Sequence, residues 1–429
     1  MFWASTMLLD HTRGKFAVGA TTFALQIPTR TFGSAILTRT PKPRPALQLS
    51  EIAFSVYYPT QSGLSTKKHQ YLDWIVRPIR GSLAGIAYFT GIPALLFWPI
   101  FFFYASSIKI PVHSNAPVLS PPTKGDNTKT WPLVIFSHGL AGQRTTYSHL
   151  CARIASTGKV VVVMEHRDGS GTFCHPKSPE TGERDSLLYI KAADTSYGDD
   201  KKFEFRRDQL GQRRFEIYAA IEALKKLSVD GNRGNLSAID DSEVDWSDFQ
   251  GKIGFDTLQL TGHSFGAATL FSLLSHEPTE GFTPLPVTHA LFLDPWLEPF
   301  ERPGPVQASR NAEVKKVVLH SEGFTLWRDH MAQMVEVAKD WGDVPIYTVA
   351  RTTHQSFSDY NVILPRLFIG KEVELLQKLS ELSVTFLDDR MEDILGRSAT
   401  REMEIETVKG RYGKEKRRLV ANAGDIIVH

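Results

Sequence analysis

Cysteine is scarce in this sequence, and neither sign of charge dominates it. Of 429 residues only Cys151 and Cys174 are cysteines, too few for a disulfide framework or a cysteine-based metal site, and this suits a reducing compartment. The formal net charge is only +2, so no general attraction to nucleic acid is expected, and no nucleic-acid-binding motif accompanies it. We therefore expect an intracellular protein that does not bind nucleic acid.

A cleavable secretory signal is not expected either. Asp10 and His11 interrupt the first apolar run before a signal core could form. Residues 1–50 contain six basic residues and one acid, a composition typical of mitochondrial transit peptides. The stretch 14–25 (GKFAVGATTFAL) alternates more like a strand than like an amphipathic helix. We expect a cytoplasmic, membrane-associated protein, with a mitochondrial location as the alternative.

The chain has enough apolar material for a packed core, since 42% of its residues are hydrophobic and 22% are charged. Apolar runs that end in polar turns alternate with helical patterns, as in a parallel sheet buried between helices. We predict helices at residues 146–157 and within 204–228, and an acidic loop at 229–252. We predict strands in EIAFSVYYP, WPLVIFSHG, VVVVMEH, FDTLQLTGHS, HALFLDPW, KKVVLHSEG and PIYTVARTTH.

The sharpest motif is Gly262-His263-Ser264-Phe265-Gly266, between a predicted strand and a predicted helix. In a nucleophile elbow the serine lies on a strained strand-to-helix turn, and small residues two positions away on each side avoid a steric clash. Glycine occupies both positions here. The pattern predicts an α/β-hydrolase fold, with a mostly parallel central sheet flanked by helices and Ser264 at the elbow.

A serine nucleophile needs an adjacent base, and the base needs an orienting carboxylate. This fold places them in the chain order serine, acid, histidine. Asp294 ends the predicted strand HALFLD, and His354 lies in the loop after PIYTVA. His320 is the rival base, but it ends a strand that comes one too early. We therefore predict that Ser264, Asp294 and His354 form a catalytic triad.

The oxyanion of a tetrahedral intermediate needs two backbone N–H donors. One comes from the residue after the nucleophile, here Phe265, and the other from a His-Gly loop after an early strand. Residues 136–142 (FSHGLAG) fit this loop, which makes Leu140 the second candidate donor and gives His138 a bracing role. Two cysteines and scattered histidines offer no recognisable zinc or calcium ligand set, so no metal and no organic cofactor is expected.

An apolar segment of 28 uncharged residues lies between Arg80 and Lys109. It exceeds the ~20 residues that span a bilayer, but Pro93 and Pro99 divide it into pieces too short to span as straight helices. A membrane span, burial in the core and an interfacial hairpin beside the active site are the alternatives, and we favour the hairpin. Its membrane-interface candidates are Trp98, Phe101, Phe102, Phe103 and Tyr104.

Five motifs occur in order within residues 131–360: FSHGLAGQRTTYS, VMEHRDGSG, GHSFGAAT, LFLDPW and THQSFSDY. Together they resemble the platelet-activating factor acetylhydrolase family. The resemblance implies a calcium-independent esterase that hydrolyses the short or oxidised acyl chain at the middle glycerol carbon of phospholipids. It also implies Ser264 as nucleophile, Asp294 as orienting acid, His354 as base, and Leu140 and Phe265 as oxyanion donors.

Some features differ from this family's pattern. Ala267 follows Gly266 where the family often has a second glycine, and the secretory signal of extracellular members is not recognised. The acidic loop at 229–252 and the basic residues within 409–418 are further differences. We expect Arg167 and Asp168 to form a structural ion pair behind the oxyanion loop.

The predicted catalytic domain runs from residue 15 to residue 398. It follows an N-terminal extension at 1–14 and precedes a charged tail at 399–429, which we expect to be solvated or partly helical. The expected partners are a phospholipid substrate and a membrane surface. Two other functions stay open: an esterase of small non-lipid esters would use the same triad, and a membrane-attached binding protein would keep it as a relic.

Overall fold

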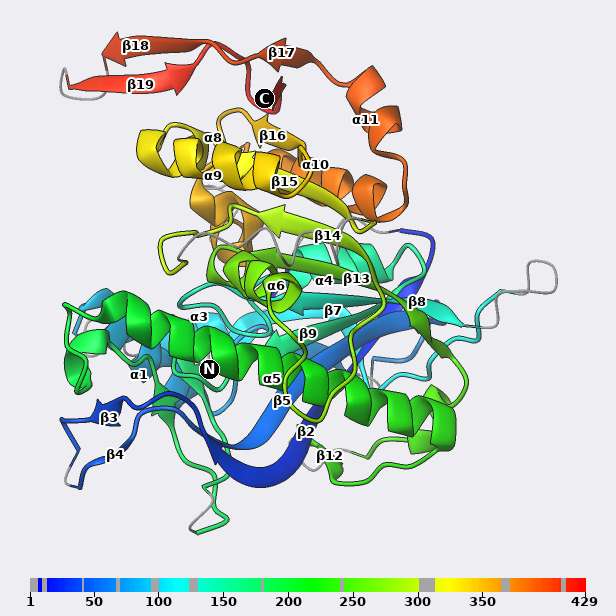
Figure 1. Ribbon diagram of the computed structural model, residues 1–429. Coiled ribbons are helices and arrows are strands. Elements are labelled where there is room, and N and C mark those ends of the chain that lie inside the picture. The colour runs from blue at the N-terminus through cyan, green and yellow to red at the C-terminus, as the bar shows by residue number, and fades with distance from the viewer. Residues whose placement is uncertain are drawn as a thin grey trace.

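The computed structural model describes residues 7–9, 14–40, 42–66, 70–93, 100–122, 130–178, 181–239, 243–300, 313–363, 371–409 and 414–429. A 14-stranded sheet runs through the molecule (Figure 1). Its strands are β1 (Met7–Leu8), β2 (Ala17–Thr31), β5 (Gln48–Thr60), β6 (Tyr71–Asp73), β7 (Ile108–Ser114), β8 (Trp131–Ser137), β9 (Val160–Glu165), β12 (Leu236–Ala238), β13 (Ile253–His263), β14 (Val287–Leu293), β15 (Lys315–Ser321), β16 (Ile346–Val349), β17 (Thr400–Glu402) and β20 (Ile426–Val428).

The strand order is β1-β7-β2-β5-β9-β8-β13-β14-β15-β16-β20-β17, with β12 beside β2 and β6 beside β7. Every neighbouring pair from β9 to β16 is parallel. Three further pairs are antiparallel: β2 with β5, β5 with β9, and β20 with β16. The carboxyl ends of β8, β13, β14, β15 and β16 therefore meet at one edge, where sites gather in parallel sheets.

Helices cover both faces of the sheet. They are α1 (Ile79–Thr90), α3 (Ile100–Ser107), α4 (Ser148–Ala155), α5 (Lys202–Asp230), α6 (Phe265–Ser275), α8 (Glu322–Thr325), α9 (Arg328–Asp340), α10 (Glu372–Leu387) and α11 (Met391–Arg397). Helices α5 and α6 pack on the face nearer the viewer in Figure 1, and α4 and α10 pack on the opposite face.

Alternating side chains of the central strands fill two separate cores. In β8, Leu133 and Ile135 pack on the face of α5 and α6, whereas Val134 and Phe136 pack on the face of α4 and α10. All four are at most 1% exposed. A strand that is buried on both faces reads as a continuous apolar run, which is why the central strands were recognisable in the sequence.

Most predicted elements are present within a few residues of their expected limits. The predicted strand at 51–59 lies within β5, and the strand-like stretch 14–25 holds the first part of β2, which continues to Thr31. The predicted helices at 146–157 and 204–228 are α4 and α5. The expected loop at 229–252 needs correction, because it contains β12, which pairs with β2 antiparallel.

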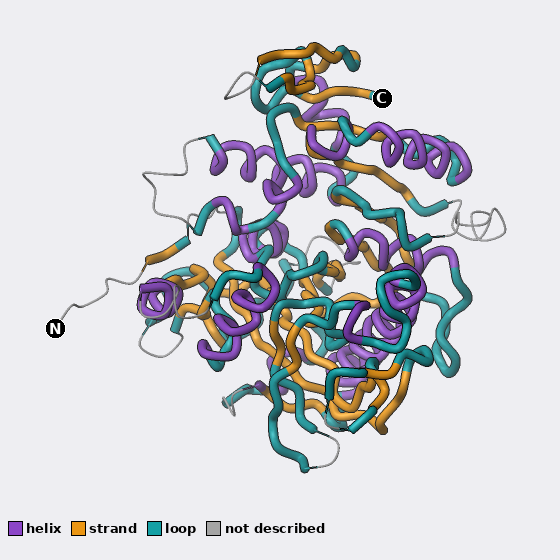
Figure 2. Tube along the Cα trace, turned by 90° about the vertical axis from the view of Figure 1, so that its left-hand side faces the viewer, coloured by secondary structure: helices purple, strands orange, loops and turns teal. Residues whose placement is uncertain are grey.

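The last residues differ from the expected solvated or partly helical tail. Strand β20 pairs with β16, and β17 pairs with β20, so both extend the central sheet. Between them, β18 (Ile405–Lys409) and β19 (Glu415–Leu419) form an antiparallel hairpin beyond the sheet (Figure 1). In Figure 2 the C-terminal end lies near the top of the view, next to helices and strands. Strand β20 forms because Ile426 and Ile427 are buried when it pairs with the sheet.

The apolar segment at 81–108 contains most of α1 and all of α3. The residues of α1 that face the core are Ile79, Leu83 and Ala87, while Phe103 on α3 is 62% exposed. Phe102 and Tyr104 are half-buried; Trp98 and the Phe101 side chain lie outside the described residues. No helix in the described part of the chain combines the length and apolarity that a bilayer crossing requires.

Candidate active site

Ser264 lies on the turn between β13 and α6, with φ 57° and ψ −119°. A residue with a side chain rarely adopts a positive φ, and the strain raises the hydroxyl above the sheet edge. The flanking glycines are required by space. A Cβ at Gly262 would lie 2.7 Å from the carbonyl carbon of Gly266. A Cβ at Gly266 would overlap the carbonyl oxygen of Ser137 and lie 2.5 Å from its carbonyl carbon.

His354 bridges Ser264 and Asp294. Its Nε2 lies 2.9 Å from Ser264 Oγ, and its Nδ1 lies 2.9 Å from Asp294 Oδ2. Because a carboxylate can only accept, Nδ1 of His354 carries the proton in this pair and the lone pair of Nε2 faces the serine hydroxyl. The structure thus brings together the three residues that were predicted as a triad, in the arrangement that activates a serine.

Asp294 follows β14 and is fully buried. Its Oδ1 accepts a hydrogen bond of 2.6 Å from the backbone N–H of Ser321, and its Oδ2 accepts one of 2.6 Å from the Ser321 hydroxyl. Ser321 ends β15, the neighbouring strand. Two donors from one residue fix the carboxylate, so the orientation of His354 depends on the register between β14 and β15.

The imidazole of His354 lies between two rings. Phe324 stacks on it with ring centroids 4.5 Å apart and an interplanar angle of 11°, and the His263 ring lies 4.3 Å away on a tilted plane. Burial lowers the pKa of His263 well below its usual value, and the nearby His354 adds to this. A neutral His263 is therefore a packing partner that places no second positive charge beside the base.

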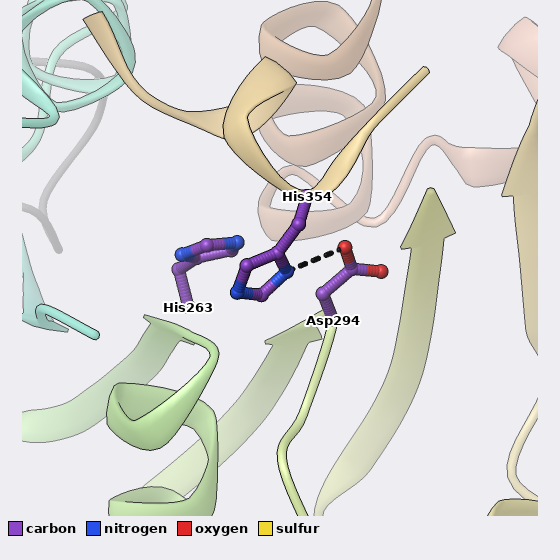
Figure 3. Close-up of side chains that lie close together, drawn as sticks. All are labelled: His263, Asp294 and His354. Atoms are coloured by element: carbon purple, nitrogen blue, oxygen red, sulfur yellow. Dashed lines mark hydrogen bonds and ion pairs between the residues drawn. The ribbon is translucent and has the colours of Figure 1, made fainter. Parts of the chain in front are cut away.

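His263, Asp294 and His354 offer three ligand-type atoms within 4.8 Å of one another (Figure 3). Metal-binding side chains can gather in this way, but both ring nitrogens of His354 already hydrogen-bond, one to Asp294 and one to Ser264. His263 also directs its Nδ1 to the Tyr147 hydroxyl at 2.8 Å. These pairings favour a proton-transfer site over a metal centre.

The loop after β8 passes directly beside Ser264. A Cβ at Gly139 would lie 2.9 Å from the Cβ of Ser264, so only glycine allows this approach. The loop is held by a hydrogen bond of 2.7 Å from Ala141 N–H to the carbonyl of Ser170. Among the described residues, neither Leu140 N–H nor Phe265 N–H donates a hydrogen bond, so both groups are available for the predicted role of oxyanion donor.

Two secondary expectations are resolved by the geometry. The rival base His320 is fully buried, and burial lowers its pKa to about 4; its ring nitrogens have no hydrogen-bond partner within the described ranges. The expected ion pair between Arg167 and Asp168 is wrong, because Arg167 pairs with Glu51 and Glu165, while Asp168 pairs with Arg213 at 2.8 Å. The long helix α5 supplies that arginine.

Several supporting residues could not be identified from the sequence. Ser321 and Phe324 follow the strand KKVVLH, but nothing in that run signals a contact with Asp294 or His354. Tyr147 lies within the motif FSHGLAGQRTTYS, and its hydroxyl contacts both His263 and the N–H of Gly139. Only its place in a recognised motif could have singled it out.

Comparison with known proteins identifies the family. The family profile described as "Platelet-activating factor acetylhydrolase, isoform II" matches residues 9–386. Platelet-activating factor acetylhydrolase of Gallus gallus is 27% identical over 70% of this chain and 68% of its own length. The protein of the same name from Canis lupus familiaris is 26% identical over 71% of this chain and 62% of its own length.

A relative from Schizosaccharomyces pombe, "Putative phospholipase A2", is 26% identical over 71% of this chain and 77% of its own length. Among solved structures, a ferulic acid esterase from Streptomyces cinnamoneus superposes with a TM-score of 0.55 at 14% identity. That match covers 92% of this chain and 94% of the esterase. At this identity it speaks for the fold alone, and it confirms the predicted α/β-hydrolase architecture.

Proposed function

The chain belongs to the platelet-activating factor acetylhydrolase family, and from this premise we propose that it is a serine esterase acting on phospholipids. The proposed reaction is hydrolysis of a short or oxidised acyl chain at the middle glycerol carbon. The observation that carries the proposal is the bridge formed by His354, whose two ring nitrogens lie 2.9 Å from Ser264 Oγ and from Asp294 Oδ2.

The proposed chemistry follows from these contacts. His354 Nε2 takes the hydroxyl proton as Ser264 Oγ attacks the acyl carbonyl carbon, and Asp294 stabilises the resulting imidazolium. The carbonyl oxygen becomes an oxyanion, to which the N–H groups of Leu140 and Phe265 are the proposed donors. His354 then returns the proton to the departing alcohol. A water molecule, deprotonated by His354, hydrolyses the acyl-enzyme and restores Ser264.

A panel of phosphatidylcholines tests this function. The acyl chain at the middle carbon varies from acetyl to palmitoyl, and each lipid is assayed with the unaltered protein and with Ser264→Ala. We expect turnover that falls with acyl length and is lost in Ser264→Ala, because removing a triad nucleophile costs about 10⁴- to 10⁶-fold in kcat. Equal turnover by Ser264→Ala would remove the assignment.

The same panel separates the alternatives. Hydrolysis of tributyrin or p-nitrophenyl acetate without hydrolysis of any phospholipid would favour an esterase of small non-lipid esters. Lipid binding without hydrolysis of any ester would favour a binding protein with a relic triad.

We extend the proposal to a membrane surface as the place of action. Several large apolar side chains are exposed on α1, just after it and on α3, namely Tyr88, Phe89, Ile92 and Phe103, which are 38%, 40%, 42% and 62% exposed. Aromatic side chains favour the boundary between headgroups and acyl chains. The Phe89→Ser/Phe103→Ser variant should float less with phosphatidylcholine vesicles yet hydrolyse a soluble ester normally.

Val229→Ser is the matched control. Val229 is 63% exposed at the carboxyl end of α5, the end of this helix that lies away from α1 and α3 in Figure 1. Its replacement should leave flotation unchanged. Equal flotation of all three proteins would contradict the membrane surface. The proposed intracellular location, cytoplasmic with mitochondria as the alternative, is tested separately by fractionating cells that express the tagged chain.

A further inference from the structure

Among the described residues, Arg213 is the largest of the fully buried side chains, and it lies on α5 behind the loop that carries Leu140. A buried guanidinium is costly unless it is paired. Arg213 Nε donates a hydrogen bond of 2.8 Å to Oδ2 of Asp168, which is also fully buried. Burial raises the pKa of Asp168, but the Arg213 charge, with contributions from His166 and Ser170, brings it below its usual value. The pair is therefore ionised and neutral overall.

The other nitrogens of Arg213 contact both sides of the proposed oxyanion hole. On the loop side, Nη1 donates to the carbonyl of His138 at 2.8 Å, and Nη2 donates to the Ser170 hydroxyl at 2.6 Å. On the elbow side, Nη1 contacts Thr269 Oγ1 at 3.2 Å. The guanidinium carbon also lies 4.4 Å from the centroid of the Phe265 ring.

These contacts are adjacent to the two candidate donors. His138 is two residues before Leu140, and Ser170 accepts the N–H of Ala141 through its carbonyl. Thr269 donates its hydroxyl to the carbonyl of Phe265 at 2.9 Å. One planar, rigid group thus connects the loop after β8 to the first turn of α6. Two donors on separate segments stabilise an oxyanion only if their spacing is fixed to a fraction of an ångström.

We propose that Arg213 is a positioning residue that fixes the spacing between the N–H groups of Leu140 and Phe265, an inference that rests on the proposed esterase function. Asp168 neutralises the guanidinium, so the role is geometric. Lysine keeps the charge but lacks the planar fork with several donors. It can pair with Asp168 but cannot connect His138, Ser170 and Thr269 together.

The experiment compares Arg213→Lys and Arg213→Met with a matched control, Arg167→Met. Arg167 is also buried and ion-paired, to Glu51 and Glu165, but within the described part of the chain its hydrogen bonds and ion pairs reach neither residues 138–142 nor α6. On a soluble p-nitrophenyl ester, kcat of Arg213→Met should fall by about 10²-fold with KM little changed, since loss of one oxyanion donor costs about 10²- to 10³-fold. Arg213→Lys should fall between this variant and the unaltered protein. Arg167→Met should melt at a lower temperature but keep kcat.

A second readout separates positioning from general loss of structure. A trifluoromethyl ketone forms a charged tetrahedral adduct with the serine, whereas the corresponding secondary alcohol does not. The inhibition constant of the ketone should rise in the Arg213 variants by the factor that kcat falls, and that of the alcohol should stay the same. Equal weakening of both inhibitors, or full kcat in Arg213→Lys, would overturn the inference.

If Arg213→Met does not fold, the variants Arg213→Lys and Thr269→Val test the positioning role instead, because both leave Asp168 paired with a cation. Thr269→Val removes only the elbow-side contact and should lower kcat less than Arg213→Lys. If the unaltered protein hydrolyses no ester, or Ser264→Ala is equally active, the proposed function fails. Normal turnover that depends on Ser264 but not on Arg213 or Thr269 overturns the Arg213 inference alone.

Discussion

Replacing Gly266 by alanine adds one methyl group where the elbow meets the end of β8. The new Cβ would overlap the carbonyl oxygen of Ser137, and it would lie 2.5 Å from Ser137 C and 2.9 Å from His138 C. Carbon atoms in contact lie about 3.5 Å apart, so the two backbones must separate by about 1 Å. Overpacking of this kind costs about 1–3 kcal/mol in the free energy of unfolding.

The displacement also moves the proposed oxyanion donors, because His138 belongs to the loop after β8 that carries Leu140. A misplacement of about 1 Å can cost about 10²-fold in rate. We therefore expect Gly266→Ala to lower both the melting temperature and kcat on a soluble ester. Gly211→Ala is the matched control: Gly211 lies within α5, and a Cβ at this position would have no neighbouring atom within 4 Å beyond the backbone of its own helix. Alanine there should stabilise the helix by up to about 1 kcal/mol. A Gly266→Ala protein with unchanged melting temperature and kcat would refute the steric reasoning.

The triad and its surroundings lead to three more expectations. His354→Ala should reduce kcat about as much as Ser264→Ala, and the double variant should be hardly worse, because triad residues act as a unit; additive losses in single-turnover assays would count against the triad. His320→Leu should keep most activity and make the fold less sensitive to acid. Burial lowers the pKa of His320 to about 4, below its value in unfolded chains, so the unfolded state binds a proton that the native state rejects. The free energy of unfolding then decreases as the pH falls from about 6.5 to 4, by at most about 3 kcal/mol. If the urea midpoint fell equally between pH 7.5 and pH 5 in the unaltered protein and in His320→Leu, this reasoning would be contradicted. Excess EDTA should leave hydrolysis intact, and loss of activity that calcium restores would contradict the mechanism.

The central part of the fold could be predicted because its signals are local. Each central strand is an apolar run followed by a polar turn, and Gly262 and Gly266 mark the elbow by their steric requirement. The order of Ser264, Asp294 and His354 along the chain then follows from the fold. Ser264 and Asp294 directly follow the neighbouring strands β13 and β14, and His354 lies in the loop after β16, a parallel strand of the same sheet, so the sheet itself brings them together.

The C-terminal strands could not be predicted in the same way. Strand β20 has only three residues, and it is a strand because it pairs with β16, which lies about eighty positions earlier in the chain. The charged residues around it favour the interpretation of a solvated tail. Short edge strands whose partners are distant in sequence carry little local signal, since pairing and burial decide them.

The two halves of the proposed site differ in what holds them. The acid half is fixed by adjacent strands, because Ser321 at the end of β15 donates both hydrogen bonds that orient Asp294 beside β14. The oxyanion half depends on Arg213, whose partners Ser170 and His138 are 43 and 75 residues away in sequence. Contacts over such separations leave no periodic signal in one sequence. Substitutions on α5 that move Arg213 should therefore lower kcat without touching the triad, whereas the orientation of Asp294 survives as long as β14 and β15 stay paired.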